Sequence, residues 1–197
     1  NIKVGGMDVR SYDMETLRNQ VAVVLQKNVL FSGTILDNIA YGLEHVTEKE
    51  VMEVIKDVGL EDMIEKLPDG IYTQLGEHGD KLSGGQRQAL TLLMATMNKP
   101  KLLLLDEHTA ALDPKTALKV LTLSARIVEE NHLTTMMITH NMKDAIKYGN
   151  RLIMMWEGKI ILDIQGEEKK KLTVKDLLDK FEEASGEEFS NDSALLS

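Results

Sequence analysis

Three apolar runs in this chain each end in polar side chains, and this repetition constrains the fold more than any other feature. The runs are Val21–Leu25, Leu102–Leu105 and Thr134–Thr139, and they lead into Gln26, into Asp106 and Glu107, and into His140, in that order. Apolar runs separated by helical patterns are typical of buried parallel strands in an α/β fold. Because ligands of such sheets bind at the carboxyl ends of the strands, we expect these polar side chains to share one site.

The composition limits the classes of protein to which the chain can belong. Its 197 residues suffice for one domain with a real core and room for a small lobe. The net charge of −9 argues against a nucleic-acid partner, and the absence of cysteine excludes disulfides and thiolate metal sites. No apolar run approaches the ~20 residues that span a bilayer. The first ten residues do not resemble a signal peptide, and we expect them to form a strand already under way within a domain.

Capping residues and glycines mark the expected helices and turns. The expected helices are Met14–Arg18, Val51–Val58 after a capping box at Thr47–Glu50, Glu61–Leu67, a helix from Gly85 to about Met97, one beginning at Asp113-Pro114, one between Asn141 and Gly149, and Thr173–Phe181. Arg151–Trp156 and Lys159–Ile164 are expected to form a hairpin, and Gly166–Lys171 a solvated charged link. We expect Met136, Met137, Met154 and Met155 to pack in the core.

The stretch LSGGQRQAL, residues 82–90, permits two interpretations. Ser83 can cap the helix that follows, and Gly84 and Gly85 allow backbone N–H groups to approach a ligand closely. A helix N-terminus with such a loop can bind phosphate. The alternative is a capped helix preceded by a glycine turn, and the stretch by itself favours neither.

The acidic pair after the four leucines predicts metal-assisted hydrolysis. Asp106 is placed to hold Mg²⁺, and Glu107 to orient and polarise an attacking water. Gln26 can join the Mg²⁺ to that water, and His140 can contact the same phosphate. The alternatives are a solvated strand end for the acids and ordinary structural roles for the glutamine and the histidine.

The motifs LSGGQ, LLLLDE, TAALD and MITHN, with the Gln after VAVVL, resemble in this order the ATPase domains of ABC transporters. The resemblance covers about residues 1–165. It implies an α/β, P-loop NTPase-like (RecA-like) parallel sheet with a helical signature subdomain at about residues 34–97, followed by a helical tail at 166–197.

The resemblance also implies the role of each motif. The carried-over catalytic residues are Gln26, Glu107 and His140, the Mg²⁺ ligands are Asp106 and Gln26, and the nucleotide-binding residues are Ser83, Gly84, Gly85, Gln86 and Asp113. In that family the signature serine and glycines hold the γ-phosphate of an ATP bound by the opposite subunit. The implied cofactors are therefore ATP and Mg²⁺, and the implied partners are a second nucleotide-binding domain and a transmembrane transporter subunit or domain.

Three features depart from the family pattern. The motif G-x-x-x-x-G-K-[ST] is absent, and in the family it lies upstream of the segment resembling Ile2–Val9, so we expect weak Mg-ATP binding by these residues alone. His108 replaces the usual proline, either as a tolerated variant or as an imidazole that adds charge beside the γ-phosphate at low pH. The chain resembles exporter domains up to about Gln88 and stand-alone ATPase subunits of uncharacterised bacterial systems after it.

The sequence thus predicts an ATP-hydrolysing, energy-coupling part of an ABC transporter, cytoplasmic and peripheral to the inner face of the cell membrane. A fold fragment that binds no nucleotide by itself is the alternative. A DNA-repair ATPase is a remote one, because the 56 residues between Gln26 and Ser83 contain no sustained heptads.

Overall fold

The structure, a computed structural model, describes residues 2–27, 30–43, 45–57, 59–76 and 79–186. The chain forms two compact units, Asn1–Ile138 and Thr139–Ser197. The expected division into a domain of residues 1–165 and a tail of residues 166–197 stays a prediction, as does the subdomain at about 34–97. Within these described ranges no helix is both long enough and apolar enough to cross a bilayer.

A parallel sheet in the first unit carries the three apolar runs. Its strand order is β3 (Val21–Val24), β6 (Leu102–Asp106) and β7 (Thr135–Ile138), with β6 in the middle. Val24 pairs with Leu105, and Leu105 pairs in turn with Met137. The strands are therefore in register at their carboxyl ends, and the predicted α/β fold with a parallel sheet is confirmed.

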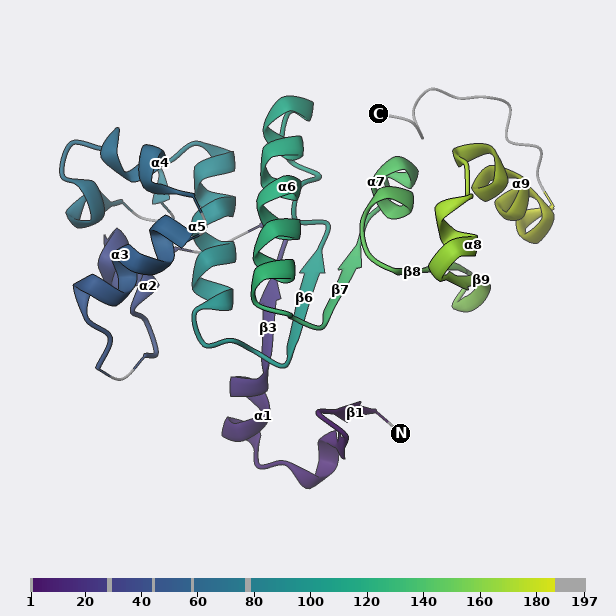
Figure 1. The fold of residues 1–197 in the computed structure, drawn as a ribbon, viewed down its shortest axis with the longest axis horizontal. Helices are drawn as coiled ribbons and strands as arrows, with labels where there is room; N and C mark the ends of the chain where they lie inside the picture. The colour runs from purple at the N-terminus through teal and green to yellow at the C-terminus, as the bar shows by residue number, and fades with distance from the viewer. Residues whose placement is uncertain (1, 28–29, 44, 58, 77–78, 187–197) are drawn as a thin grey trace. The chain divides into compact units, whose positions relative to one another are not determined.

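Two helices, α5 (Gly84–Thr96) and α6 (Pro114–Glu130), lie side by side along this sheet (Figure 1). Val24, Leu103 and Leu105 are buried in the same cluster as residues of both helices, because alternate strand residues point to one face. On the other face Val23 and Ile138 are exposed.

The expected burial of four methionines is wrong for two of them. Met137 and Met154 are half-buried, whereas Met136 is 56% exposed and Met155 is 59% exposed. Each exposed methionine is a strand neighbour of a half-buried one, and consecutive strand residues face opposite sides of a sheet.

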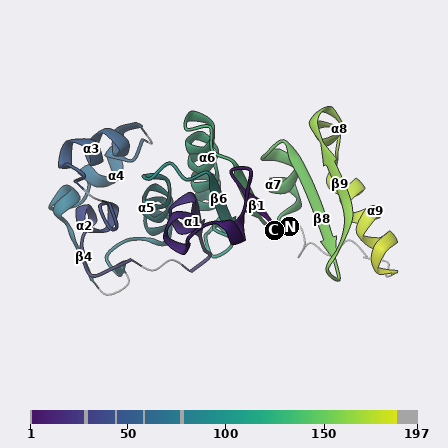
Figure 2. The ribbon, with the colours of Figure 1, turned by 90° about the horizontal axis from the view of Figure 1, so that it is seen from below.

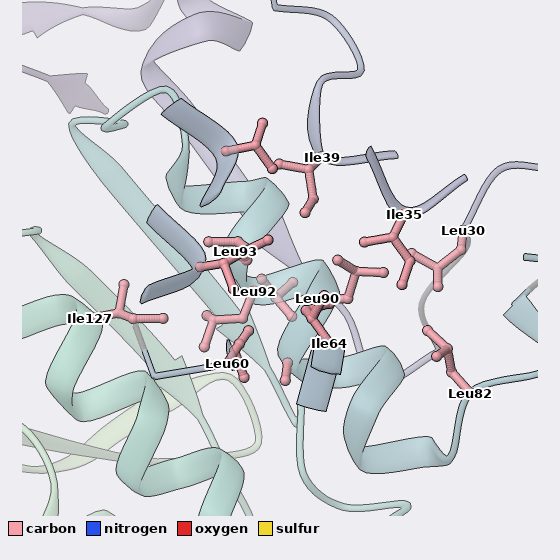
Figure 3. Close-up of a cluster of buried hydrophobic side chains, with 14 of the residues drawn as sticks. Leu30, Ile35, Ile39, Leu60, Ile64, Leu82, Leu90, Leu92, Leu93 and Ile127 are labelled. Carbon is pink, nitrogen blue, oxygen red and sulfur yellow. The ribbon is translucent and has the colours of Figure 1, made fainter. Parts of the chain in front are cut away.

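Short elements between β3 and α5 supply most of the remaining core. They are β4 (Gly33–Thr34), α2 (Ile35–Ile39), α3 (Glu48–Asp57), α4 (Glu61–Glu65), the 3-10 helix η2 (Gly70–Tyr72) and β5 (Gln74–Leu75), which pairs antiparallel with β4. Figure 3 shows their buried side chains, among them Ile35, Ile39 and Ile64, gathered with Leu90 and Leu93 of α5. The predicted capping box of α3 is confirmed, since Thr47 N–H donates to Glu50 at 2.8 Å and Glu50 N–H donates to Thr47 at 3.3 Å.

Residues 2–20 form a small hairpin, a 3-10 turn and a helix. The elements are β1 (Lys3–Val4), β2 (Met7–Asp8), the 3-10 helix η1 (Val9–Ser11) and α1 (Met14–Gln20). The hairpin turns at Gly5 and Gly6, whose φ angles of 56° and 84° favour glycine. Asp13 caps α1 by accepting from Thr16 N–H at 2.8 Å, so this helix begins where the sequence predicts.

The described part of the second unit, residues 139–186, consists of an antiparallel hairpin and three helices. Its elements are α7 (Met142–Lys147), β8 (Arg151–Trp156), β9 (Lys159–Gln165), α8 (Gly166–Lys170) and α9 (Val174–Ser185), and Figure 2 shows β8 beside β9. Trp156 of β8 meets Phe181 of α9 edge to face, with ring centroids 4.6 Å apart. The predicted caps Asn141 and Thr173 are confirmed, since each side chain accepts from a backbone N–H of its helix.

The expectation that Gly166–Lys171 is a solvated link is confirmed for the exposure of five of its residues and is wrong for Lys169 and for the structure of the segment. This segment contains α8, and Lys169 is only 3% exposed. Its ammonium donates to the carbonyl oxygens of Ile146 and Tyr148, the latter at 3.0 Å. Carbonyls at a helix end lack partners within the helix, so the lysine finds acceptors at the end of α7. Burial lowers the pKa of Lys169, but the two acceptors stabilise its ammonium form.

Two glycines of the signature stretch lie where α5 approaches the start of α6. A Cβ added to Gly85 would lie 2.3 Å from Cγ2 of Thr116, and one added to Gly84 would lie 3.1 Å from Cδ2 of Leu112. The first distance is far below van der Waals contact, whereas the second asks for a small shift of a flexible side chain. The two helices therefore come this close because the residue at position 85 has no side chain.

We predict that Gly85→Ala destabilises the chain and that Gly84→Ala does not. Alanine restricts the unfolded chain more than glycine does, which stabilises the folded state by roughly 0.4–1 kcal/mol and offsets the small strain at position 84. At position 85 the overlap with Thr116 should outweigh this gain, for a net loss of about 1–2 kcal/mol. Urea denaturation of both variants tests this. Thr116→Ser removes the clashing methyl group and should restore part of the loss in a Gly85→Ala background, and equal stability of the two alanine variants would refute the packing argument.

Candidate functional site

The sheet register places Gln26 and Glu107 at the same level. Gln26 follows Val24 by two residues and Glu107 follows Leu105 by two, and Val24 and Leu105 are a parallel pair. Gln26 is exposed, while Asp106 and Glu107 are half-buried. The polar residues after β3 and β6 therefore follow the carboxyl ends of two neighbouring parallel strands, at one edge of the sheet. Their joint action in one site stays a prediction.

Glu107 has a backbone conformation that is unusual for a residue other than glycine. Its φ angle of 44° lies in the left-handed region, and the chain turns there from β6 toward α6. Its N–H donates to the carbonyl oxygen of Ile138 at 3.0 Å, and its own carbonyl oxygen accepts from Ala110 N–H at 3.0 Å. Two backbone hydrogen bonds thus hold the residue at the point where β6 ends.

His108 points away from this edge into the core of the first unit. The side chain is 2% exposed, and its Nε2 lies 2.9 Å from Oγ of Ser124 in α6. Burial lowers the pKa of His108 to about 4, so the imidazole is neutral at pH 7. The buried ring, held against α6, does not fit the hypothesis of an imidazole that adds charge beside a phosphate, and it fits the alternative of a tolerated variant. The sequence analysis did not identify Ser124 as the partner of His108. The available signal is a serine on the inner face of an amphipathic helix, which needs a buried polar partner.

The signature stretch begins α5 with a complete capping box. Ser83 N–H donates to Oε1 of Gln86 at 2.8 Å, and Gln86 N–H donates to Oγ of Ser83 at 3.3 Å. Ser83 and Gly84 are exposed, while Gly85 and Gln86 are half-buried. The cap interpretation of this stretch is confirmed, and its phosphate-binding role stays a prediction.

Asp113 begins α6 in the same manner. Its Oδ1 accepts from Thr116 N–H at 3.1 Å, and hydrogen bonds from the Thr116 side chain and backbone hold the pKa of the carboxyl below its usual value. The close approaches of Gly84 to Leu112 and of Gly85 to Thr116 set the start of α5 beside the start of α6. The structure thus brings the signature stretch and Asp113 together.

A buried glutamine connects the signature helix to the first strand end. Gln88 is buried on α5, and its Nε2 donates to the carbonyl oxygen of Leu25, the residue before Gln26, in a long hydrogen bond of 3.5 Å. Sequence reasoning missed this contact because the two residues lie far apart in the chain, and the one available signal is a glutamine directly before the apolar stretch of α5.

His140 belongs to the second unit, where it is exposed. It follows β7 by two residues and precedes Asn141, whose N–H donates to Oγ1 of Thr139 at 3.0 Å. The turn that begins α7 is thus fixed by local hydrogen bonds on both sides of the histidine, since Asn141 also accepts from Asp144 N–H at 3.1 Å.

The donors at the strand ends suit Mg²⁺ better than a transition metal. In the part of the chain that the structure describes, no three His, Cys, Asp or Glu residues form a metal-binding group. Asp106 and Gln26 offer a carboxylate and an amide oxygen, and Mg²⁺ commonly takes one or two carboxylates together with phosphate oxygens and waters. The residues present therefore fit a Mg²⁺ ion that arrives with a nucleotide.

Comparisons with known proteins identify the family. A family model described as ABC transporter matches residues 1–110. The chain is 51% identical over 125 residues to the tyrosine transport ATP-binding protein of Clostridioides difficile, covering 61% of this chain and 50% of that protein. It is 38% identical over 172 residues to the ATP-dependent lipid A-core flippase of Desulfotalea psychrophila, covering 87% of this chain and 30% of the flippase.

A solved structure agrees with these sequence matches. The ATP-bound structure of a bacterial Atm1-family ABC exporter superposes with a TM-score of 0.72 and 28% identity, covering 92% of this chain and 31% of the exporter. The chain thus spans half or less of the length of these relatives. The match supports the predicted P-loop NTPase-like fold, and with the family model it shows that the chain belongs to the ABC transporter family, within the ATP-binding part of its members.

Proposed function

We propose that this chain is part of an ATP-hydrolysing, energy-coupling domain of an ABC transporter, with ATP held between two such domains arranged head to tail. The observation that carries the proposal is the shared level of Gln26 and Glu107 beyond a parallel strand pair, next to the Asp106 carboxylate. Ligands of open α/β sheets bind at this edge, and the residue types there are those that phosphoanhydride hydrolysis needs.

Each residue at the strand ends has a role in this proposal. Glu107 accepts a proton from the water that attacks the γ-phosphate, and its held backbone keeps the carboxylate at the end of β6. Asp106 and Gln26 would hold Mg²⁺, which supplies neutralisation of phosphate charge when bound. His140 donates a hydrogen bond to the γ-phosphate and orients it.

The signature stretch acts on the nucleotide of the opposite domain. Ser83, Gly84, Gly85, Gln86 and Asp113 occupy the adjacent starts of α5 and α6. Two neighbouring helix N-termini provide N–H groups and partial positive charge, which favours an anion from outside. The exposure of Ser83, Gly84 and Asp113 leaves this surface open to a partner domain.

A transmembrane subunit or domain is the proposed second partner, which would place the chain in the cytoplasm at the inner face of the membrane. The relatives include a tyrosine transport ATP-binding protein and a lipid A-core flippase. Tyr41 is 65% exposed and stacks on the exposed ring of Phe31 at 4.3 Å, while Asn38 fixes the backbone of Phe31 by hydrogen bonds to its N–H and carbonyl oxygen. Rigid exposed aromatic pairs are typical anchors of protein interfaces.

We predict that Glu107→Gln lowers ATP hydrolysis by about 10²-fold or more without weakening nucleotide binding, because the amide keeps the shape of the carboxylate but accepts a proton poorly. The measurement uses the chain joined to a segment that carries a P-loop, since residues 1–197 contain no such motif. Turnover and nucleotide affinity are determined for both forms. Unchanged turnover would show that Glu107 only ends a strand.

We predict that this chain stimulates an ABC domain whose own signature has been inactivated, and that Ser83→Arg abolishes the stimulation. The arginine would fill the phosphate position and block closure of the two domains. Loss of the cap should change the stability by only about 1 kcal/mol. ATPase rates are measured against added chain, with Ser83→Ala as a control that removes the hydroxyl cap without adding bulk. Equal stimulation by the arginine variant would leave the helix cap as the only role of Ser83.

We predict that Tyr41→Ala weakens assembly with a membrane domain and leaves the free energy of unfolding of the chain nearly unchanged. The exposed ring adds little to the core, but its removal takes an anchor from the interface. Tyr72→Ala is the control, because Tyr72 is 51% exposed in the same region and is not part of the pair. The test replaces the matching part of the D. psychrophila flippase with this chain and compares detergent stability of the assembled transporter. Equal effects of the two variants would contradict the proposed interface.

A further inference from the structure

We propose that His108 and Ser124 are positioning residues that hold Glu107 in its left-handed conformation and thereby set the rate of ATP hydrolysis. The inference rests on the proposed role of Glu107 as the base. His108 and Ser124 are both buried and contact each other, so neither side chain is exposed at the edge of the sheet where the nucleotide would lie.

The hydrogen-bond directions in this pair follow from the number of available protons. Ser124 Oγ donates its one proton to the carbonyl oxygen of Val120 at 2.8 Å. Its contact of 2.9 Å with Nε2 of His108 must then be a bond that Ser124 accepts, so the imidazole carries its proton on Nε2. The imidazole N–H of His108 thus donates to Ser124, and the hydroxyl of Ser124 donates to the backbone of α6, so both donors have an acceptor.

These two hydrogen bonds fix His108, the residue directly after Glu107 with its left-handed backbone. Glu107 is held by the hydrogen bond from its N–H to Ile138 and by the one that its carbonyl oxygen accepts from Ala110. A left-handed glutamate persists only where its surroundings determine it, and the side chain of His108 adds an anchor directly after it. Because the anchor is on α6, the helix capped by Asp113 also holds the segment that carries Glu107.

A His108–Ser124 pair that only stabilises the fold would make the same contacts. The experiment must therefore distinguish an effect on stability from an effect on the position of Glu107. Replacing both partners by apolar side chains removes the buried polar groups together and can restore stability. The variant His108→Leu/Ser124→Ala should therefore be nearly as stable as the wild type. If the hydrogen bond positions Glu107, this variant should still turn over slowly, because only the two backbone hydrogen bonds of Glu107 then hold the segment after β6 and its anchor on α6 is lost.

The first measurement uses the 197-residue chain without nucleotide. Amide hydrogen exchange of Glu107 and Ala110 is followed by NMR, with the Ala22 amide of β3 as an internal reference. Ser124→Ala should speed the exchange at both sites by about 10-fold relative to the reference, because local opening becomes easier. The single variant His108→Gln, whose side-chain amide can still donate to Ser124, should keep most of the wild-type protection. Exchange that is unchanged in Ser124→Ala would overturn the proposal.

The second measurement uses the chain joined to a P-loop segment. Ser124→Ala and the double apolar variant should each lower kcat about 10-fold, with KM for ATP within about twofold of the wild type, whereas the single variant His108→Gln should keep most of kcat. Full turnover in the double variant would overturn the positioning role and leave a packing role. Glu107→Gln is the reference: if it keeps full turnover, the proposed base is wrong and positioning falls with it. If Glu107→Gln lowers kcat and Ser124→Ala does not, the positioning role is wrong while the role of Glu107 as the base stands.

Discussion

Parallel pairing between β3 and β6 is the interaction on which the rest of the site depends. It sets Val24 against Leu105, and the chain direction then carries Gln26 and Glu107 past the sheet at the same level. An antiparallel partner would send one of the two polar ends to the opposite edge. The pairing is stabilised by burial of one sheet face under α5 and α6, where alternate residues of both strands join a single apolar cluster.

The contact between α5 and α6 extends this order to the signature stretch. Because Gly85 has no side chain, the N-terminus of α5 can lie so close to Thr116 of α6 that no larger residue fits there. Thr116 in turn donates its N–H to Asp113, so the glycine, the threonine and the capping aspartate form one connected unit. A change at position 85 would therefore reach Asp113 through packing even if no ligand were bound.

Sequence patterns predicted those parts of the molecule that local chemistry determines. The strand ends, the caps at Thr47, Asn141 and Thr173, and the parallel sheet follow from short-range rules of apolar periodicity and capping. Buried polar partners from distant segments did not follow from the sequence. The contacts of His108 with Ser124, of Gln88 with Leu25, and of Lys169 with the end of α7 each join residues whose proximity only the tertiary fold creates.

In the first unit one helix, α6, would serve both proposed roles. Asp113 and Thr116 at the start of α6 sit beside the signature glycines, which the proposal directs toward a partner domain. Ser124 further along α6 accepts the hydrogen bond from His108, beside the residue proposed to act on the chain's own nucleotide. A rigid helix keeps the distance between these two points constant, so movement of α6 on closure of two domains would act on both sites together. The histidine at position 108 would strengthen this connection, because its ring hydrogen-bonds to α6, whereas a proline ring has no donor and could meet the helix only by packing.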